Sequence, residues 1–457
     1  MSFIYPRIEF DSWAESTKER LMLMLITLFR SNLTKICIEP TNTLINEDMQ
    51  EEQNTFPLAM VMSLCNNLKQ LYLGTGLVFR YNPVQWSASY SLTGLAVNIS
   101  RGMNGLERLI TQCPHLEYLS ISEHSSRILA LLDEYCPHLR YFHMSDNPRL
   151  GTRKEKQDEE KNIIPITSYG LHELTYKIPS LAVLQAFVPL FIKSKETLEK
   201  LMLHITVAEE INNSNNSDSS SDQQLYPTFG NVGFNRLTEL QLTGAGDTTG
   251  QLAVATASMM QRCSTLESVR LCFPGSPVPD RFFTSLVNQP FIRVVHFQDI
   301  DFPTTGAVQL FTELAIRSKK NTTSALETIG IERCRGVTSK MFCALTDILT
   351  LRCIRLGFNS SSISVNDLSS IIRKLRTLPC LEIISFSHIQ HINDTMIIQL
   401  TEYDGLTDLV LKGLPDITDE GILTVAQQKN SLKRISISHC RKISEQTKAF
   451  ISLKFPS

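Results

Sequence analysis

The sequence predicts an α/β solenoid in which short parallel strands alternate with helices and each strand–helix unit stacks on the next. Two observations in residues 405–451 predict it. An apolar triplet at i, i+3 and i+5 occurs twice, twenty-six residues apart, as Leu406, Leu409, Leu411 and then Leu432, Ile435, Ile437. Between them, residues 418–428 begin at a polar N-cap and carry apolar residues at helical spacing. One strand and one helix cannot bury their own apolar faces, so such units must stack.

The same triplet recurs along most of the chain. The triplets begin at Leu33, Leu68, Leu92, Leu116, Leu139, Leu181, Leu198, Leu237, Leu266, Ile292, Leu326, Leu351, Leu381, Leu406 and Leu432. From Leu326 onward the separations are 25, 30, 25 and 26 residues, close to the period of leucine-rich repeats. The triplets at Leu92 and Leu181 are the least regular, because Gly94 interrupts the first and the second lies only 17 residues before Leu198.

The repeats predict the domain organisation. We expect a leucine-rich-repeat solenoid over residues 33–443, curved, with parallel strands on its concave face and helices on its convex face. Residues 1–32 form an N-terminal capping segment and residues 444–457 a C-terminal capping helix. The mixed-charge run 151–162 and the Asn/Ser-rich run 212–224 contain no apolar residue to bury, and we expect both to be loop insertions.

Composition excludes several classes of function. The chain has 457 residues, 42% hydrophobic and 20% charged, with a formal net charge of -2, so it lacks the basic excess of a nucleic-acid binder. Its most apolar early run, residues 21–29, is shorter than the roughly 20 residues of a membrane span. Eleven cysteines without a CxxC pair favour buried packing groups in a reducing compartment. We therefore expect neither nucleic acid nor membrane as a partner, and a cytoplasmic or nuclear location.

Residues 417–440 resemble the cysteine-containing leucine-rich repeat. Ile417, Thr418, Asp419 and Gly421 match its I-T-D-x-G helix start, and Cys440 matches its strand-end cysteine. The phrases CPHL at 113–116 and 136–139 match its lead into the next strand. This repeat subtype is typical of F-box/LRR proteins, the substrate receptors of SCF ubiquitin ligases. The resemblance implies recognition of a protein substrate for ubiquitin-dependent degradation, with Skp1 and cullin as further partners.

The chain also departs from that family. An F-box opens with a Leu-Pro phrase ahead of the repeats, whereas residues 1–32 contain no such phrase and the first repeat begins at Leu33. No clear F-box is therefore evident. The alternative is an F-box-free regulatory or scaffold protein that acts by protein–protein interaction in signalling or cell-cycle control.

Candidate binding residues follow from the strand pattern, because residues between the buried positions face the concave side. The row at i+4 is Cys37, Tyr72, Ala96, Ser120, His143, Gln185, Met202, Gln241, Arg270, His296, Gly330, Arg355, Ser385, Val410 and Ser436. Aromatic and Arg side chains supply contact area and bind carboxylates. We predict two protein-binding patches on and beside this row, one of Tyr118, Arg140, Tyr141 and His143, the other of Arg270, Arg293, His296, Arg352 and Arg355.

The sequence contains no catalytic motif that we could identify. There is no Walker phosphate loop, no H-E-x-x-H and no G-x-S-x-G. The glycine-rich run 244–250 lacks the Lys-Ser/Thr of a phosphate loop and is interpreted as a turn between a strand and a helix. We therefore expect no enzyme activity, no metal and no cofactor.

Overall fold

The computed structural model describes residues 24, 33–38, 62, 65, 67–73, 90–97, 103–122, 126–144, 170–179, 181–206, 229–247, 249–303, 305–320, 325–358, 363–428 and 431–455. The loop insertions expected at 151–162 and 212–224 lie outside these residues, as does the N-terminal capping segment apart from Met24.

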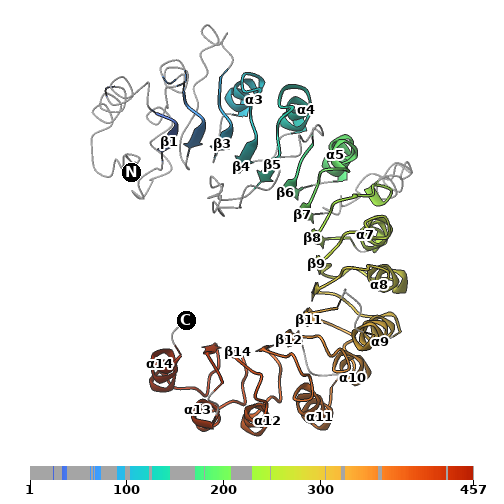
Figure 1. The fold of residues 1–457 in the computed structure, drawn as a ribbon, viewed down its shortest axis with the longest axis vertical. Helices are drawn as coiled ribbons and strands as arrows, with labels where there is room; N and C mark the ends of the chain where they lie inside the picture. Colours follow the sequence, from blue (N-terminus) through green and yellow to red (C-terminus); the bar gives the residue numbers. More distant parts are fainter. Residues whose placement is uncertain are drawn as a thin grey trace, which may run out of the picture. The chain divides into compact units, whose positions relative to one another are not determined.

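The described chain forms parallel strands that alternate with helices and follow the order of the sequence (Figure 1). It divides into two compact units, and the boundary falls within β7. The strands of unit 1 are β1 (Lys35–Ile38), β2 (Gln70–Leu73), β3 (Gly94–Val97), β4 (Tyr118–Ile121), β5 (Tyr141–Met144) and β6 (Glu173–Ile178), together with the first four residues of β7 (Lys200–Thr206). Those of unit 2 are β8 (Glu239–Ala245), β9 (Ser268–Cys272), β10 (Val294–Gln298), β11 (Thr328–Cys334), β12 (Cys353–Phe358), β13 (Ile383–Ser387), β14 (Asp408–Lys412) and β15 (Arg434–Ser438). The fold is a leucine-rich-repeat solenoid, as the sequence predicts.

The helices lie on one side of the sheet within each unit (Figure 1). Unit 1 contains α3 (Met103–Thr111), α4 (Ser126–Tyr135) and α5 (Leu181–Ser194). Unit 2 contains α7 (Gln251–Gln261), α8 (Asp280–Val287), α9 (Gly306–Lys319), α10 (Ser339–Leu345), α11 (Val365–Leu375), α12 (Asp394–Gln399) with the 3₁₀ turn η2 (Leu400–Glu402), α13 (Asp419–Gln428) and α14 (Glu445–Lys454). The last of these is the expected C-terminal helix, and Ser444 caps it by accepting a hydrogen bond from the Thr447 N–H at 3.2 Å.

One predicted strand is wrong. Residues 181–194 form helix α5, and the strand of this repeat lies earlier, at β6. Its buried triplet is Leu171, Leu174 and Tyr176, in which an aromatic residue occupies the last position. The i+4 residue of this repeat is therefore Thr175, which lies opposite His143 in the register. Gln185, the residue predicted for this position, lies in α5. The irregular triplet at Leu92, by contrast, does form a strand, β3.

The core lies between the strands and the helices. Most leucines and isoleucines of the triplets are buried, and Leu71, Leu240, Ile354 and Leu409 are 0% exposed. Leu33 and Ile36 in the first triplet and Ile437 in the last are half-buried. The cysteines of the resemblance are buried as well, among them Cys113, Cys136, Cys334 and Cys440. Desolvation raises the pKa of the Cys136 thiol to about 12, so this cysteine is an uncharged packing group.

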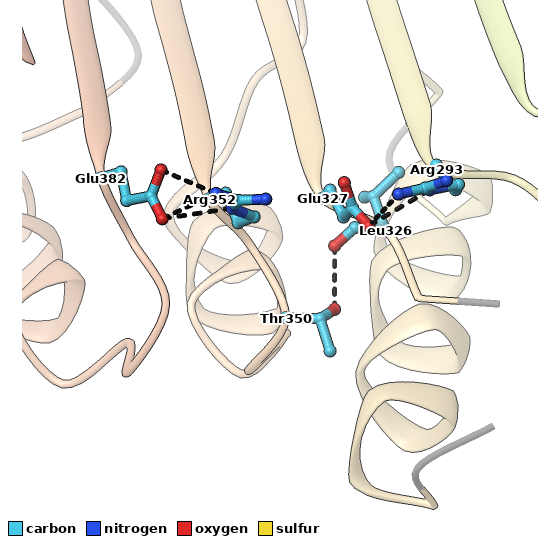
Figure 2. Close-up of polar contacts among 6 residues, drawn as sticks. All are labelled: Arg293, Leu326, Glu327, Thr350, Arg352 and Glu382. Carbon is cyan, nitrogen blue, oxygen red and sulfur yellow. Dashed lines mark hydrogen bonds and ion pairs between the residues drawn. The ribbon is translucent and has the colours of Figure 1, made fainter. Parts of the chain in front are cut away.

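Hydroxyl groups join successive repeats just before the strands. The residue that precedes a triplet donates a hydrogen bond to the carbonyl of the first triplet residue in the previous repeat. Thr350 Oγ1 donates in this way to the Leu326 carbonyl at 2.8 Å (Figure 2). Thr197, Thr265 and Ser431 repeat the contact at 2.8 to 2.9 Å. The sequence pattern of these Ser and Thr residues is thus explained by cohesion between repeats.

The Asp of the I-T-D motif joins repeats at the helix starts. Asp394 accepts from the Thr418 N–H at 2.9 Å and from the Thr418 hydroxyl at 2.6 Å. Asp419 accepts in the same way from the Ser444 N–H at 2.9 Å. Each carboxylate thus serves a free donor at the beginning of the next helix as well as the positive end of its own helix.

The glycine-rich run 244–250 is the turn that the sequence predicts. It leads from the end of β8 into α7, and Gly246 and Gly250 adopt positive φ angles of 82° and 71°. Asp247 is buried at 3% exposure and accepts hydrogen bonds from the Thr249 hydroxyl at 2.8 Å and from the Leu252 N–H at 2.7 Å. The polar groups of this turn therefore cap the helix.

Candidate functional site

The strand face opposite the helices carries the residue row that the sequence predicts. In unit 2 the register places the i+4 residues directly beside one another on adjacent strands. They are Gln241, Arg270, His296, Gly330, Arg355, Ser385, Val410 and Ser436. We take this row as the candidate site of unit 2, because the hydrogen-bond ladder between the strands fixes the positions of its members relative to one another.

The predicted patch of unit 1 is brought together by ring contacts. The Tyr118 ring lies 5.4 Å from the His143 ring and 6.5 Å from the Tyr141 ring, measured between centroids. All three side chains are half-buried. Arg140 is exposed and precedes β5, beside this cluster in the chain. The three rings form one aromatic surface on strands β4 and β5.

His143 is held in its neutral form. Burial lowers its pKa below the ordinary value of 6.5; the Glu173 carboxylate acts in the opposite direction, and Lys200 adds to the lowering. Two further row members, Ala96 and Ser120, were expected to be exposed but are buried at 0% and 1%. Ser120 lies between Ala96 and His143 in the register, so the small side chains of this row are covered by larger neighbouring ones.

The predicted patch of unit 2 divides into two groups. Arg293 and Arg352 occupy position i+1, where the chain enters β10 and β12 (Figure 2). Arg293 donates through two nitrogens to Glu327 Oε1 at 2.7 and 3.1 Å, and Arg352 binds both Glu382 oxygens at 2.8 and 3.0 Å. These two arginines are therefore paired with glutamates that occupy the same i+1 position in the next repeat.

The other group lies on the i+4 row. Arg270 and Arg355 are both exposed, and within the described part of the chain neither makes an ion pair with a carboxylate. Between them stand His296 on β10 and Gly330 on β11. The His296 ring lies against Gly330, since a Cβ built on that glycine would overlap its Cδ2 atom.

The Glu332 carboxylate lies beside His296, a member of this group. His296 Nε2 lies 3.3 Å from Glu332 Oε1 but is not aligned for a good hydrogen bond. The His296 contact is the main cause that lowers the pKa of Glu332, with smaller contributions from the charges of Arg355 and Arg333, while burial opposes them. Glu332 is therefore ionised at neutral pH.

At the ends of β10 and β11, sequence reasoning missed a second ion pair. Arg333 donates to both oxygens of Asp299 at 2.7 and 2.8 Å. Both residues have a φ of 52°, in the left-handed region. Asp299 directly follows β10, and Arg333 lies at the irregularity between Glu332 and Cys334 near the end of β11. The Arg333 contact holds the pKa of Asp299 below its usual value of 3.8. In the sequence, both residues stand at position i+7 of their repeats, counted from Ile292 and Leu326. The triplet pattern ends at i+5, so it could not predict this pair.

A groove of about 380 Å³ runs along β15, the last strand. It is lined by Val410, Arg434, Ile435, Ser436, Ile437, Lys448, Ile451, Ser452 and Phe455. Arg434 is paired with Asp408 at 2.7 Å and Lys448 with Glu445 at 2.6 Å. Its cations are therefore already neutralised, in contrast to Arg270 and Arg355.

The described residues offer neither a cluster of metal ligands nor a membrane-spanning helix. Within them, no group of three or more His, Cys, Asp or Glu side chains is placed to hold a metal ion. In the same part of the chain no helix is long and apolar enough to cross a membrane. The described chemistry of the strand face is thus that of aromatic rings, guanidinium groups and hydroxyls.

Comparison with known proteins gives structural neighbours only. No protein-family model matches the chain, and no curated protein matches it. Among solved structures, it is similar to a chain in the crystal structure of the Rad7 and Elc1 complex in yeast, at 15% identity and a TM-score of 0.39, over 95% of this chain and 86% of that one. It is also similar to an internalin from Listeria monocytogenes, at 14% identity and a TM-score of 0.37, over 96% and 92%. The fold assignment above rests on the strands and helices of this chain itself.

Proposed function

We propose that this protein binds a protein partner through the strand face of its repeats. The proposal rests on the large side chains that lie on the face opposite the helices. In unit 1 these are the rings of Tyr118, Tyr141 and His143. In unit 2 they are Arg270 and Arg355, which are exposed and make no ion pair with any residue that the structure describes. Aromatic and Arg side chains dominate the energetics of protein interfaces. The rigid ladder beneath them fixes their positions before a partner arrives.

The finer proposal is that the partner is a substrate for ubiquitin ligation. It is supported by the resemblance of residues 417–440 to the repeats of F-box/LRR receptors, and by Asp394 and Asp419, which use the I-T-D aspartate to join repeats. In this proposal the chain acts as the recognition part of an SCF-type complex and performs no chemistry itself. The alternative, a regulatory protein without a ligase partner, uses the same strand face.

We further propose that the protein works in the cytoplasm or nucleus. Leaving Cys37 aside, the other ten cysteines are free thiols, and seven of them are buried. Several have raised pKa values because of desolvation, including Cys263, whose pKa is about 11. Free buried thiols spread through a repeat array are typical of proteins in a reducing compartment.

The test is an affinity purification of the tagged full chain from a eukaryotic lysate, analysed by mass spectrometry. Two face variants, Tyr141→Ala and Arg270→Gln, are compared with Lys340→Ala, an exposed residue of helix α10 on the other side of the sheet. We expect a partner that the face variants lose and the helix variant keeps. A partner lost equally in all three, or in none, would refute binding through the strand face.

The same experiment separates the two finer proposals. Stoichiometric Skp1 and cullin in the purified complex would support the ligase receptor. A face-dependent partner without Skp1 or cullin would refute it and favour the regulatory alternative.

A further inference from the structure

The arginines of strands β9 to β12 differ in whether their charge is used inside the fold. Arg293 and Arg352, at i+1, are neutralised by Glu327 and Glu382 of the next repeat (Figure 2). Arg270, at i+4, has no ion pair within the described residues. Arg355, also at i+4, lies beside the Cys353 thiol and has no carboxylate at ion-pair distance among the described residues. Within the described residues, the i+4 pair is therefore left without an acidic partner.

The register fixes the distance between these two charges. Arg270, His296, Gly330 and Arg355 lie side by side on four neighbouring strands. Adjacent strands are about 4.8 Å apart, so the Cα atoms of the two arginines are separated by about 14 Å. Between them the surface is low, because Gly330 has no side chain and the His296 ring lies against it.

The i+4 row itself carries no acidic residue beside the two arginines, because Gln241, His296, Gly330 and Ser385 occupy its neighbouring positions. On one side the neighbouring row is uncharged on β9 to β12, where it consists of Ser268, Val294, Thr328 and Cys353, but on β8 it continues with Glu239, which lies beside Ser268. On the other side Asp299 is paired with Arg333, and Glu332 is directed to His296. Two carboxylates therefore flank the two guanidinium groups, Glu332 toward the strand ends and Glu239 on β8, and neither lies in the i+4 row itself.

We propose that this surface binds an extended acidic peptide segment of a partner protein, with two carboxylate side chains four residues apart. An extended chain rises about 3.3 Å per residue, so residues i and i+4 are about 13 Å apart, close to the separation of Arg270 and Arg355. Residues i, i+2 and i+4 point to the same side of the extended peptide. Each guanidinium binds one carboxylate with two hydrogen bonds, and the central residue is small and lies over His296 and Gly330.

The geometry favours two carboxylates over one phosphate group. A dianionic phosphate would draw both guanidinium groups to one point between β9 and β12. That point lies on the strands that carry His296 and Gly330, within reach of the ionised Glu332, which repels a dianion. Two separate monoanions lie over β9 and β12 instead, farther from Glu332.

This inference rests on the proposed function, because it names the kind of protein segment that the strand face takes. The experiment is selection of a random peptide library displayed on phage against the full chain, followed by fluorescence anisotropy with a selected, labelled peptide. We expect selected peptides to carry Asp or Glu pairs four residues apart. We expect Arg270→Gln combined with Arg355→Gln to weaken binding about tenfold or more, as expected for two charge-assisted contacts.

The matched control is Arg293→Gln combined with Arg352→Gln. Both double variants remove two exposed positive charges from the same group of strands, so a loss caused by net charge alone would be equal in both. We expect the control to stay within about threefold of the parent, since its arginines are engaged with Glu327 and Glu382. Equal losses, selected peptides without acidic pairs, or no selected peptide would overturn the inference.

Two further outcomes separate its failure from that of the proposed function. Peptides that require Tyr141 but not Arg270 or Arg355 would leave protein binding standing and overturn the acidic site. A phosphorylated peptide that binds when its glutamate counterpart does not would also overturn it. Circular dichroism of each variant checks that the fold is retained.

Discussion

Removal of the Asp394 carboxylate should loosen the array between α12 and α13. This carboxylate accepts the Thr418 N–H at 2.9 Å and the Thr418 hydroxyl at 2.6 Å, and it begins helix α12. A hydrogen bond to a charged group contributes about 1.5 to 3 kcal/mol when it is well buried. Asp394 is half-buried, so we take about 1 kcal/mol for each bond and expect Asp394→Ala to cost about 2 kcal/mol.

The assay is hydrogen exchange of the full chain, resolved on peptides that cover residues 415–428. Local opening governs exchange there, so a loss of about 2 kcal/mol should speed exchange of the first turn of α13 about thirtyfold. Asp394→Asn keeps one acceptor oxygen, so its exchange rate should lie between those of the parent and of Asp394→Ala. The matched control is Asp347→Ala, whose exposed side chain makes no hydrogen bond within the described structure. If Asp394→Ala exchanged like the parent or like the control, the carboxylate would not join the repeats.

Three further predictions concern other residues. Gly421→Ala should destabilise the contact between α12 and α13, because a Cβ at this position would overlap the Asp394 carboxylate. In the double variant with Asp394→Ala, the loss of stability measured by thermal melting should be smaller than the sum of the two single losses. His143 has a lowered pKa because of burial, so its neutral form stabilises the fold above pH 6.5, and this contribution is lost as pH falls toward the folded-state pKa; a titration by NMR that placed it at or above 6.5 would contradict this. Iodoacetamide should label the exposed Cys343 and Cys380 of the native protein first, and mass spectrometry that found a buried thiol labelled as fast would refute the assigned burial.

The architecture could be predicted from the sequence because it depends on one repeated local pattern. A buried triplet with period-two alternation needs only short-range information, so the strands of fourteen of the fifteen predicted triplets, including the diluted one at Leu92, form where expected. The exception shows the limit of the pattern. Leu181 and Leu184 match the triplet spacing but lie on a helix, and the true strand was missed because Tyr176 takes the place of an aliphatic residue.

The candidate site could be predicted only in part, because residue type does not say whether a charge is already used. The aromatic cluster of Tyr118, Tyr141 and His143 was found because ring contacts follow from neighbouring positions on adjacent strands. The role of Arg293 and Arg352 was not, since it depends on which side chains the register brings opposite them.

Position within the repeat therefore separates cohesion from recognition in unit 2. At i+1 the sequence alternates in sign, from Arg293 to Glu327, Arg352 and Glu382, and neighbouring residues on strands about 5 Å apart neutralise one another. At i+4 no acid stands in the row between Gln241 and Ser436, so an arginine there finds no partner of the same row. A partner that bound to the i+1 arginines would have to break their ion pairs with Glu327 and Glu382, which join neighbouring repeats. A partner that bound to the i+4 arginines would break no ion pair between described residues. The i+4 row is thus the part of the face that a partner can bury with the smallest loss of contacts between repeats.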